Sequence, residues 1–253
     1  MSRDMMRTLP WDLKIPDDKA TLWFLGQAGY YLKSNKSILI DPYLSDSVSK
    51  VAPLFGRSYP VPVAPSLIKA DIFIATHDHL DHLDPDTIKA YAHKDTTTFV
   101  SPRHAGKKLA ELGVKNITVI DQGDIAIVEG VRIEGIFALP TSPDVLDTAG
   151  YHITFPNGKT VYHTSDTAYC DLLLKACPKA DVLLTCINGK YGNLNIPQAI
   201  ELTRAVNPKY VIPNHYDVMA LNSENPESFR FFCQDENIEA KCVILELLDK
   251  FIW

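Results

Sequence analysis

The chain has 253 residues, enough to bury the core of one large domain or of two small ones. It is 46% hydrophobic and 22% charged, without repeats or low-complexity tracts, and no apolar run is long enough to span a bilayer. A net charge of −6 weighs against nucleic-acid binding, which ordinarily needs a basic surface. Because the start has no apolar signal core and the five cysteines are widely spaced without a Cys-x-x-Cys pair, we expect reduced thiols and a cytoplasmic protein.

Apolar runs, several with period-two alternation, predict the strands. In chain order these are residues 21–33, 37–40, 71–76, 98–100, 117–120, 124–139 (two strands joined at Glu129-Gly130), 150–155, 160–163, 182–187, 210–212 and 241–247. We expect the first two runs to form a hairpin, with Gly26 and Gly29 marking a bulge or a close backbone approach. The sequence Pro156-Asn157-Gly158 is typical of the turn of a second hairpin.

Helices are predicted over residues 84–94, 103–112, 197–206 and 226–236. The first of them starts with Asp84 as a cap and Pro85 in the first turn. Residues 43–70 contain four prolines and little periodicity, which favours a long ordered loop of the kind that covers a site. An antiparallel meander that runs into β-α alternation, repeated in two halves, predicts two mixed sheets packed face to face with helices outside. We expect residues 1–253 to form one such αββα domain.

The segment from Ala75 to His82 carries most of the chemical information in the chain. His77, His79 and His82 lie within six residues together with Asp78 and Asp81, directly after an apolar run. A core cannot accept so many polar groups without a partner for each, whereas one metal site can bind several of them. Histidine is the commonest metal ligand, and a His-x-His spacing projects two rings to the same side of an extended backbone. The segment therefore predicts a metal centre.

Two further apolar runs end in residues of ligand type. Asp166 follows the run that begins at Thr160, and His215 follows the run that begins at Tyr210. Either residue alone would be ordinary at the end of a strand, but together with the 77–82 segment they become the expected distal ligands of one centre. Asp41, which ends the run 37–40, is predicted to orient a ligand histidine from behind.

The order of these ligands, each placed where a strand passes into a loop, resembles that of the metallo-β-lactamase superfamily. The flanking sequences are similar to those of the L-ascorbate-6-phosphate lactonase branch, and the similarity covers about residues 20–250. The segments that carry it are residues 25–30, 38–44, 75–84, 162–166, 188–193 and 211–217. The resemblance implies the metallo-β-lactamase fold, and it implies a small sugar-acid lactone, with or without a phosphate group, as substrate.

The same resemblance implies roles for individual residues. One or two divalent ions, manganese or zinc, would be bound by His77, His79, Asp81, His82, Asp166 and His215, with Asp166 able to bridge two ions. Asp81 would also act in catalysis by positioning the activated water that attacks the lactone carbonyl. The polar loop after the run 182–187 would contact substrate through Asn188, Lys190, Tyr191 and Asn193.

Two positions depart from the family pattern. Most relatives carry glycine where Ser165 stands. In most of the superfamily a histidine follows the strand that ends near Ala138. Here the sequence is Leu139-Pro140-Thr141-Ser142, without a histidine, and the lactonase relatives also lack this residue. The centre then has four protein ligands at one position (Asp81, His82, Asp166 and His215) and three at the other. Thr141 or His152 could complete the second set, so we expect two ions of unequal affinity.

Three functions remain open from the sequence. The first is a metal-dependent hydrolase of the lactonase kind, acting on a small molecule without nucleic-acid or membrane partners, alone or as a homo-oligomer. The second is a phosphodiesterase or nuclease of the same superfamily, and the third is a metal-bound sensing module without catalysis. Among the other histidines, His163 is predicted to lie in the core, His152 to be structural, and His104 to lie on a helix surface.

Overall fold

The computed structural model describes residues 12–253, so the N-terminal segment expected to lack a signal core lies outside the described residues. The strands are β1 Thr21–Gly26, β2 Gly29–Lys33, β3 Ser37–Ile40, β4 Ile72–Ile74, β5 Thr98–Ser101, β6 Ile117–Val119, β7 Ile125–Val128, β8 Val131–Ile136, β9 Gly150–Thr154, β10 Thr160–His163, β11 Val182–Cys186, β12 Tyr210–Asn214, β13 Lys241–Cys242 and β14 Lys250–Ile252. The α-helices are α1 Ser47–Val51, α2 Pro85–Ala90, α3 Arg103–Glu111, α4 Asp171–Ala176, α5 Ile196–Val206 and α6 Pro226–Asp235. Short 3-10 turns are η2 Pro53–Phe55, η3 Pro65–Leu67 and η4 Ala220–Asn222.

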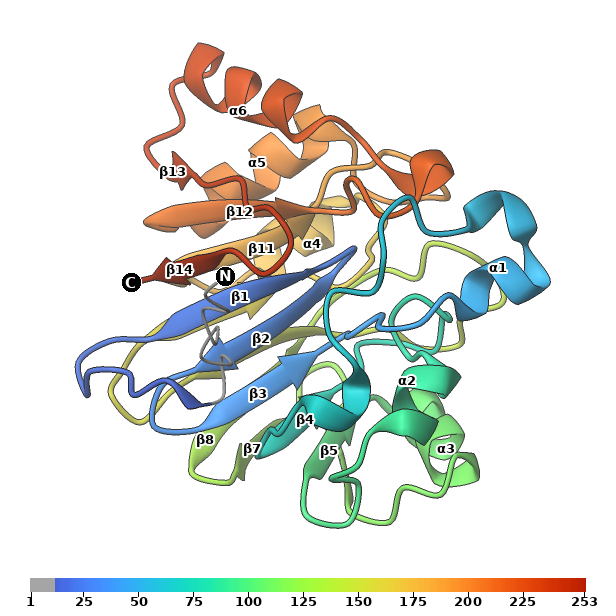
Figure 1. Ribbon diagram of the computed structural model, residues 1–253. Helices are drawn as coiled ribbons and strands as arrows, with labels where there is room; N and C mark the ends of the chain where they lie inside the picture. The colour runs from blue at the N-terminus through green and yellow to red at the C-terminus, as the bar shows by residue number, and fades with distance from the viewer. Residues whose placement is uncertain (1–11) are drawn as a thin grey trace, which may run out of the picture.

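The strands form two seven-stranded sheets with parallel and antiparallel pairs in each. The first has the order β14-β1-β2-β3-β4-β5-β6 and the second the order β13-β12-β11-β10-β9-β8-β7. In Figure 1 the two sheets lie against one another, with α5 and α6 beyond the second and α2 and α3 beside the first. The predicted sandwich of two mixed sheets flanked by helices is confirmed.

The period-two pattern of the strands explains the layers. In β3, Ile38 and Ile40 point into the core between the sheets, whereas Leu39 points to the opposite face and packs with residues of α2 and α3. The second sheet has the same division, because Val182 and Leu184 of β11 face the inter-sheet core and Leu183 packs under the other helices. Each sheet is therefore apolar on both faces, which requires the helical layers outside.

The first hairpin differs from its prediction. Residues 21–33 form two strands, β1 and β2, so that β1, β2 and β3 make an antiparallel meander. The chain reverses at Gly26 and Gln27, both in the left-handed region with φ of 97° and 57°. Gly29 is the predicted close approach, since a Cβ there would lie 2.9 Å from the backbone oxygen of Asp41.

Two other predictions are wrong in extent. The helix expected to reach residue 94 ends at Ala90, although Asp84 caps it as predicted by accepting from the backbone N–H of Asp86. The strand expected over residues 241–247 pairs for only two residues, after which the chain leaves the second sheet and β14 pairs with β1 in the first. Neither β14 nor α4 was predicted, because each is too short to show a period of its own.

Nothing between residues 12 and 253 forms a helix long and apolar enough to cross a membrane. The five cysteines are free thiols, in agreement with the sequence. The predicted loop over residues 43–70 is ordered around α1, η2 and η3, and it contributes Val48 and Phe55 to the wall of a cavity described below.

Candidate metal centre

The expected ligands meet where parallel strands end. In the first sheet β3 and β4 are parallel, and in the second β10, β11 and β12 are parallel. The carboxyl ends of parallel strands lie at one edge of a sheet, so the loops that follow β4, β10 and β12 are brought together. They deliver the segment 77–82, then Asp166, then His215. All six expected ligands lie together at this edge.

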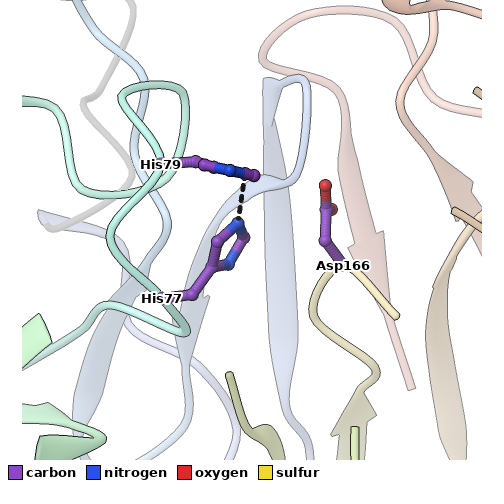
Figure 2. A group of neighbouring side chains, drawn as sticks. All are labelled: His77, His79 and Asp166. Atoms are coloured by element: carbon purple, nitrogen blue, oxygen red, sulfur yellow. Dashed lines mark hydrogen bonds between the residues drawn. The ribbon is translucent and has the colours of Figure 1, made fainter. Parts of the chain in front are cut away.

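His77, His79 and Asp166 form the first of two donor groups. His77 Nε2 lies 3.1 Å from His79 Nδ1, and Asp166 faces both rings from the loop after β10 (Figure 2). The ligand atoms of the three residues lie within 4.8 Å of one another. This separation suits three donors around one cation.

Asp81, His82 and His215 form the second donor group, within the same 4.8 Å limit. Asp166 contacts this group as well, because its Oδ1 lies 2.7 Å from His215 Nε2 and 3.2 Å from His82 Nε2. One carboxylate therefore borders both groups, as a bridging ligand would. His82 and His215 are fully buried, and Asp81 lies at the edge of the cavity.

Two of the imidazoles are held in the tautomer that a metal needs. The side chain of Asp41 accepts from the backbone N–H and the hydroxyl of Thr76, at 2.8 and 2.7 Å, and contacts His82 Nδ1 at 2.7 Å. His82 Nδ1 must then carry the hydrogen, which leaves Nε2 as a lone-pair donor. Since the Thr76 hydroxyl already donates to Asp41, it accepts from His77 Nδ1 at 3.0 Å and leaves His77 Nε2 free in the same way. The structure thus places Asp41 behind His82.

Gln27 and Asn193 hold the remaining donors. The Gln27 amide contacts Asp81 Oδ2 at 3.0 Å and His215 Nδ1 at 2.9 Å, and the Asn193 amide donates to Asp166 Oδ2 at 2.8 Å. The role of Gln27 was not predicted from the sequence. The only available signal was its position beside Gly26, since a glycine-rich turn brings backbone close to a neighbouring segment.

Burial and opposite charges shift the pKa values of several groups in the centre. Burial lowers the pKa of His82, but the carboxylates of Asp166, Asp81 and Asp41 outweigh it and hold that pKa well above its usual value. Burial raises the pKa of Asp166, but His215 and His82 outweigh it and hold that pKa well below its usual value. Burial and the neighbouring His82 both lower the pKa of His77. The carboxylates and imidazoles of the centre therefore interact strongly with one another, which agrees with a site built to bind a cation.

Unsatisfied atoms give an independent test of whether a metal fits. His82 Nε2, His215 Nε2 and Asp166 Oδ1 are buried without a hydrogen-bond partner, although buried polar atoms normally have one. The three atoms converge on one another, and their other ring or carboxylate atoms are bound to Asp41, Gln27 and Asn193. The residues present therefore fit a divalent ion with nitrogen and oxygen ligands.

Several residues at the strand ends that form the centre have a left-handed backbone conformation, which directs their side chains into it. His215 has φ of 59° and Asp41 has φ of 44°, values that cost roughly 1 kcal/mol or more for a residue with a Cβ. Ser165, one of the two positions at which the chain was expected to depart from the family pattern, has φ of 61°. Its hydroxyl contacts Thr148 Oγ1 at 2.9 Å and His77 Nδ1 at 3.3 Å, and these contacts offset the strain.

The segment that lacks the expected histidine lies beside His79. Ser142 Oγ is 3.3 Å from His79 Nε2 and also donates to Asp144, whose own Oδ2 lies 3.8 Å from the same nitrogen. This is the ring atom that points away from His77, so Ser142 and Asp144 support His79 from behind. His152 contacts Glu134 at 2.9 Å instead of the donor groups, while Thr141 lines the cavity next to them.

Of the four residues predicted to contact substrate in the polar loop after β11, two line a cavity at the centre and two do not. Tyr191 and Asn193 line a cavity of about 280 Å³ that opens beside His79, Asp81 and Asp166. Asn188 and Lys190 do not line it: the Asn188 amide donates to Asn222 at 2.6 Å, and Lys190 Nζ donates to the Ser223 backbone at 2.9 Å. Both side chains are directed to the segment after β12, so these two are not brought to the predicted substrate site.

The other histidines fall into two kinds. His163 is fully buried and contacts the Ala28 carbonyl at 3.0 Å, which confirms its prediction. His104, predicted on a helix surface, is half-buried in the first turn of α3, where its Nε2 lies 3.2 Å from Asp78 Oδ2 and its backbone N–H donates to Asp147 at 2.6 Å. These contacts place His104 behind the loop that carries the expected ligands. Asp78 and Asp147 are distant from His104 in sequence, so no local pattern could predict the contacts.

Comparison with known proteins agrees with this geometry. Residues 36–216 match the family described as the β-lactamase superfamily domain. A UPF0173 metal-dependent hydrolase of Archaeoglobus fulgidus is 28% identical over 234 residues, covering 88% of this chain and 94% of that protein. A second one, from Thermoplasma acidophilum, is 29% identical over 211 residues and covers 81% and 87%.

Among solved structures, Igni18, a metallo hydrolase from Ignicoccus hospitalis, superposes with a TM-score of 0.73 at 24% identity, covering 93% of this chain and 98% of that chain. This likeness concerns the fold. The family match covers more than half of the chain, and it includes all six donor residues, from His77 to His215. The chain therefore belongs to the β-lactamase superfamily, among its metal-dependent hydrolases.

Proposed function

We propose that this metal-dependent hydrolase is a lactonase, which opens a small lactone or related ester with water. The observation that carries the proposal is the cavity of about 280 Å³ beside the donor groups, since it brings His79, Asp81 and Asp166 to a space that a small substrate can enter. The resemblance of the flanking segments to sugar-acid lactonases supports the same reaction. Manganese and zinc are the metals that we propose for the centre.

The donor set is suited to attack on a carbonyl. His77, His79 and Asp166 would hold one divalent ion, and Asp81, His82, His215 and Asp166 a second. Such ions supply an acidified water and a Lewis acid for the carbonyl oxygen. Asp81 lines the cavity while Gln27 holds its Oδ2, so it is placed to take a proton from the attacking water and to return it to the leaving ring oxygen.

The protein also controls the geometry of the reaction. Asn193 holds Asp166 by a hydrogen bond of 2.8 Å, and the loop 43–70 closes one side of the cavity through Val48 and Phe55. A fixed carboxylate and a partly closed cavity align the water with the carbonyl and limit competing solvent.

A phosphodiesterase or nuclease would use the same donors on a phosphoryl group. The net charge of −6 disfavours a polyanionic substrate, and Asp144 adds an exposed carboxylate at the cavity. A sensing module without catalysis would not need a cavity beside the donor groups that a small substrate can enter. Both alternatives therefore have less support than the lactonase.

Hydrolysis of lactones and of bis-p-nitrophenyl phosphate by the protein loaded with one metal will test the proposal. We expect lactone hydrolysis to be faster at equal metal loading and to depend little on salt. Asp81→Asn should lower kcat by roughly 10²- to 10⁴-fold, the usual effect of removing a general base. Faster cleavage of RNA or cyclic nucleotides, falling steeply with added salt, would favour the phosphodiesterase, and inactivity towards every ester and phosphodiester would favour the sensing module.

A further inference from the structure

The cavity beside the donor groups has two unlike walls. One wall is made by donors and carboxylates, among them Asp81, Asp144 and Asp166. The other is made by Val48, Phe55, Tyr191 and Met219. A substrate whose reacting carbonyl lies at the donors must place its remaining atoms against this apolar wall.

The apolar wall is built from three separate segments that pack on one another. Val48 and Phe55, from α1 and η2, pack against a small cluster of Tyr43, Val218 and Met219 that is distinct from the main cores. Phe55 also packs against Tyr191, with ring centroids 5.5 Å apart and planes inclined at 56°. Because each segment supports the others, the wall is preformed and is suited to an apolar group.

No cationic side chain lines the cavity among residues 12–253. Three cations of the segments next to the apolar wall have partners away from the cavity. Lys50 pairs with Asp86 at 2.5 Å, Arg57 donates to the Tyr43 carbonyl at 2.8 Å, and Lys190 donates to the Ser223 carbonyl at 2.9 Å. A phosphate group at the far end of a substrate would therefore meet Asp144 or apolar side chains in place of the arginine or lysine that it needs.

We infer that the substrate is a neutral lactone or ester with an apolar substituent, which lies against Val48, Phe55, Tyr191 and Met219, and that phosphorylated sugar lactones are excluded. This inference rests on the proposed function for the reaction itself. The apolar specificity can be tested separately, however, because the wall determines which group binds whether or not that group is hydrolysed.

A series of γ-alkyl lactones of increasing chain length, with glucono-1,5-lactone 6-phosphate as the phosphorylated probe, tests the inference on the metal-loaded protein. Each added methylene should raise kcat/KM roughly three- to fourfold until the cavity is filled, which corresponds to the usual gain on burying one methylene. The phosphorylated lactone should be hydrolysed more slowly than the unphosphorylated one. A flat chain-length series, or preference for the phosphorylated probe, would overturn the inference while leaving the lactonase proposal intact.

Matched variants test whether the apolar wall is responsible for the chain-length dependence. Phe55→Ala should remove most of the chain-length dependence and act mainly through KM, because a ground-state apolar contact is lost. Leu54→Ala is the control, since Leu54 is the neighbouring residue, is 80% exposed and does not line the cavity. Val48→Lys places a cation on the wall and should improve hydrolysis of the phosphorylated probe. Equal chain-length dependence in Phe55→Ala and Leu54→Ala would overturn the assignment of the wall.

Binding without hydrolysis separates this inference from the proposed function. A 5-hexyl-2-pyrrolidinone, in which a lactam replaces the lactone, should bind the metal-loaded protein in calorimetry at least tenfold more tightly than 2-pyrrolidinone, and Phe55→Ala should abolish the difference. If no lactone is hydrolysed but this difference is found, the lactonase proposal fails and the apolar specificity stands. Equal binding of the two lactams would overturn the apolar specificity even in an active lactonase.

Discussion

The two donor groups of the centre are built to different degrees of rigidity. In the group of Asp81, His82 and His215, both imidazoles are fully buried, and Asp41 and Gln27 fix the atoms behind them. In the group of His77 and His79, the His79 side chain is 29% exposed, and Ser142 and Asp144 lie behind it. The comparison suggests that one position binds its ion before substrate arrives, and that the other leaves room for water and substrate.

The largest effect on metal binding is expected when Asp166, the residue that both donor groups share, is removed. Asp166→Ala should abolish hydrolysis and lower the affinity at both positions by at least about a hundredfold, because each loses a charged ligand. Metal content after dialysis, measured by mass spectrometry, should fall nearly to zero while circular dichroism stays unchanged. Asp235→Ala, on the exposed end of α6, is the control, and wild-type metal content in Asp166→Ala would show that the carboxylate is not a ligand.

A substitution of Asp41, which contacts His82 in the group of Asp81, His82 and His215, should affect the metal affinity of that group more than that of the other. Asp41→Asn cannot accept from both Thr76 and His82 as the carboxylate does, so it should weaken the enclosed position by roughly 10- to 100-fold, the usual cost of losing such support. The open position should change much less. Calorimetric titration of the metal-free variant checks this, with its melting temperature as a control for folding, and equal weakening at both positions would contradict the separation.

The wild-type protein should already show the difference. The enclosed position has Asp81, His82, His215 and Asp166, and the open one has only His77, His79 and Asp166. Titration of the metal-free protein with zinc or manganese should therefore give two affinities that differ by about tenfold or more, since one more charged or imidazole ligand strengthens binding. Two ions of indistinguishable affinity would mean that another group completes the open position.

The smallest effect is expected at Ser142. Ser142→Ala removes the contact to His79 Nε2 but leaves Asp144 near it, so the affinity of the open position should fall by about two- to fivefold, at the low end for such supporting contacts. The enclosed position should not change. Leu146→Ala, an exposed residue of the same loop, is the matched control, and an equal loss in both variants would show that the loop as a whole, not Ser142, supports His79.

The sequence was sufficient to predict which histidines and carboxylates gather at the candidate centre, because the pattern that marks them is local. Three histidines and two carboxylates within six residues are more than a core accepts without a common partner, and the parallel strands then bring the distal loops to the same edge. The same logic identified Asp41, which the structure places 2.7 Å from His82 Nδ1. The sandwich itself followed from strand periodicity for the same reason.

Contacts between distant segments could not be predicted in this way. Gln27 lies 54 residues from Asp81 and 188 from His215, and nothing in its own neighbourhood marks it as polar support for them. His104 has a helical surface pattern, yet the fold presses it against Asp78. The position of Lys190 in a polar loop predicts a contact with substrate, but its amine donates to the backbone carbonyl of Ser223. Periodicity reports which face is apolar, not which polar side chains will meet.

The pairing of β14 with β1 has a consequence for biosynthesis. The first six strands of that sheet are complete by residue 119, but the outer edge of β1 finds its partner only when residues 250–252 have been made. During synthesis the backbone groups of Thr21 to Trp23 on that edge stay open while most of the chain emerges from the ribosome. An unpaired edge of this kind can join a second nascent chain, so the time of greatest risk of aggregation falls before the last strand is released.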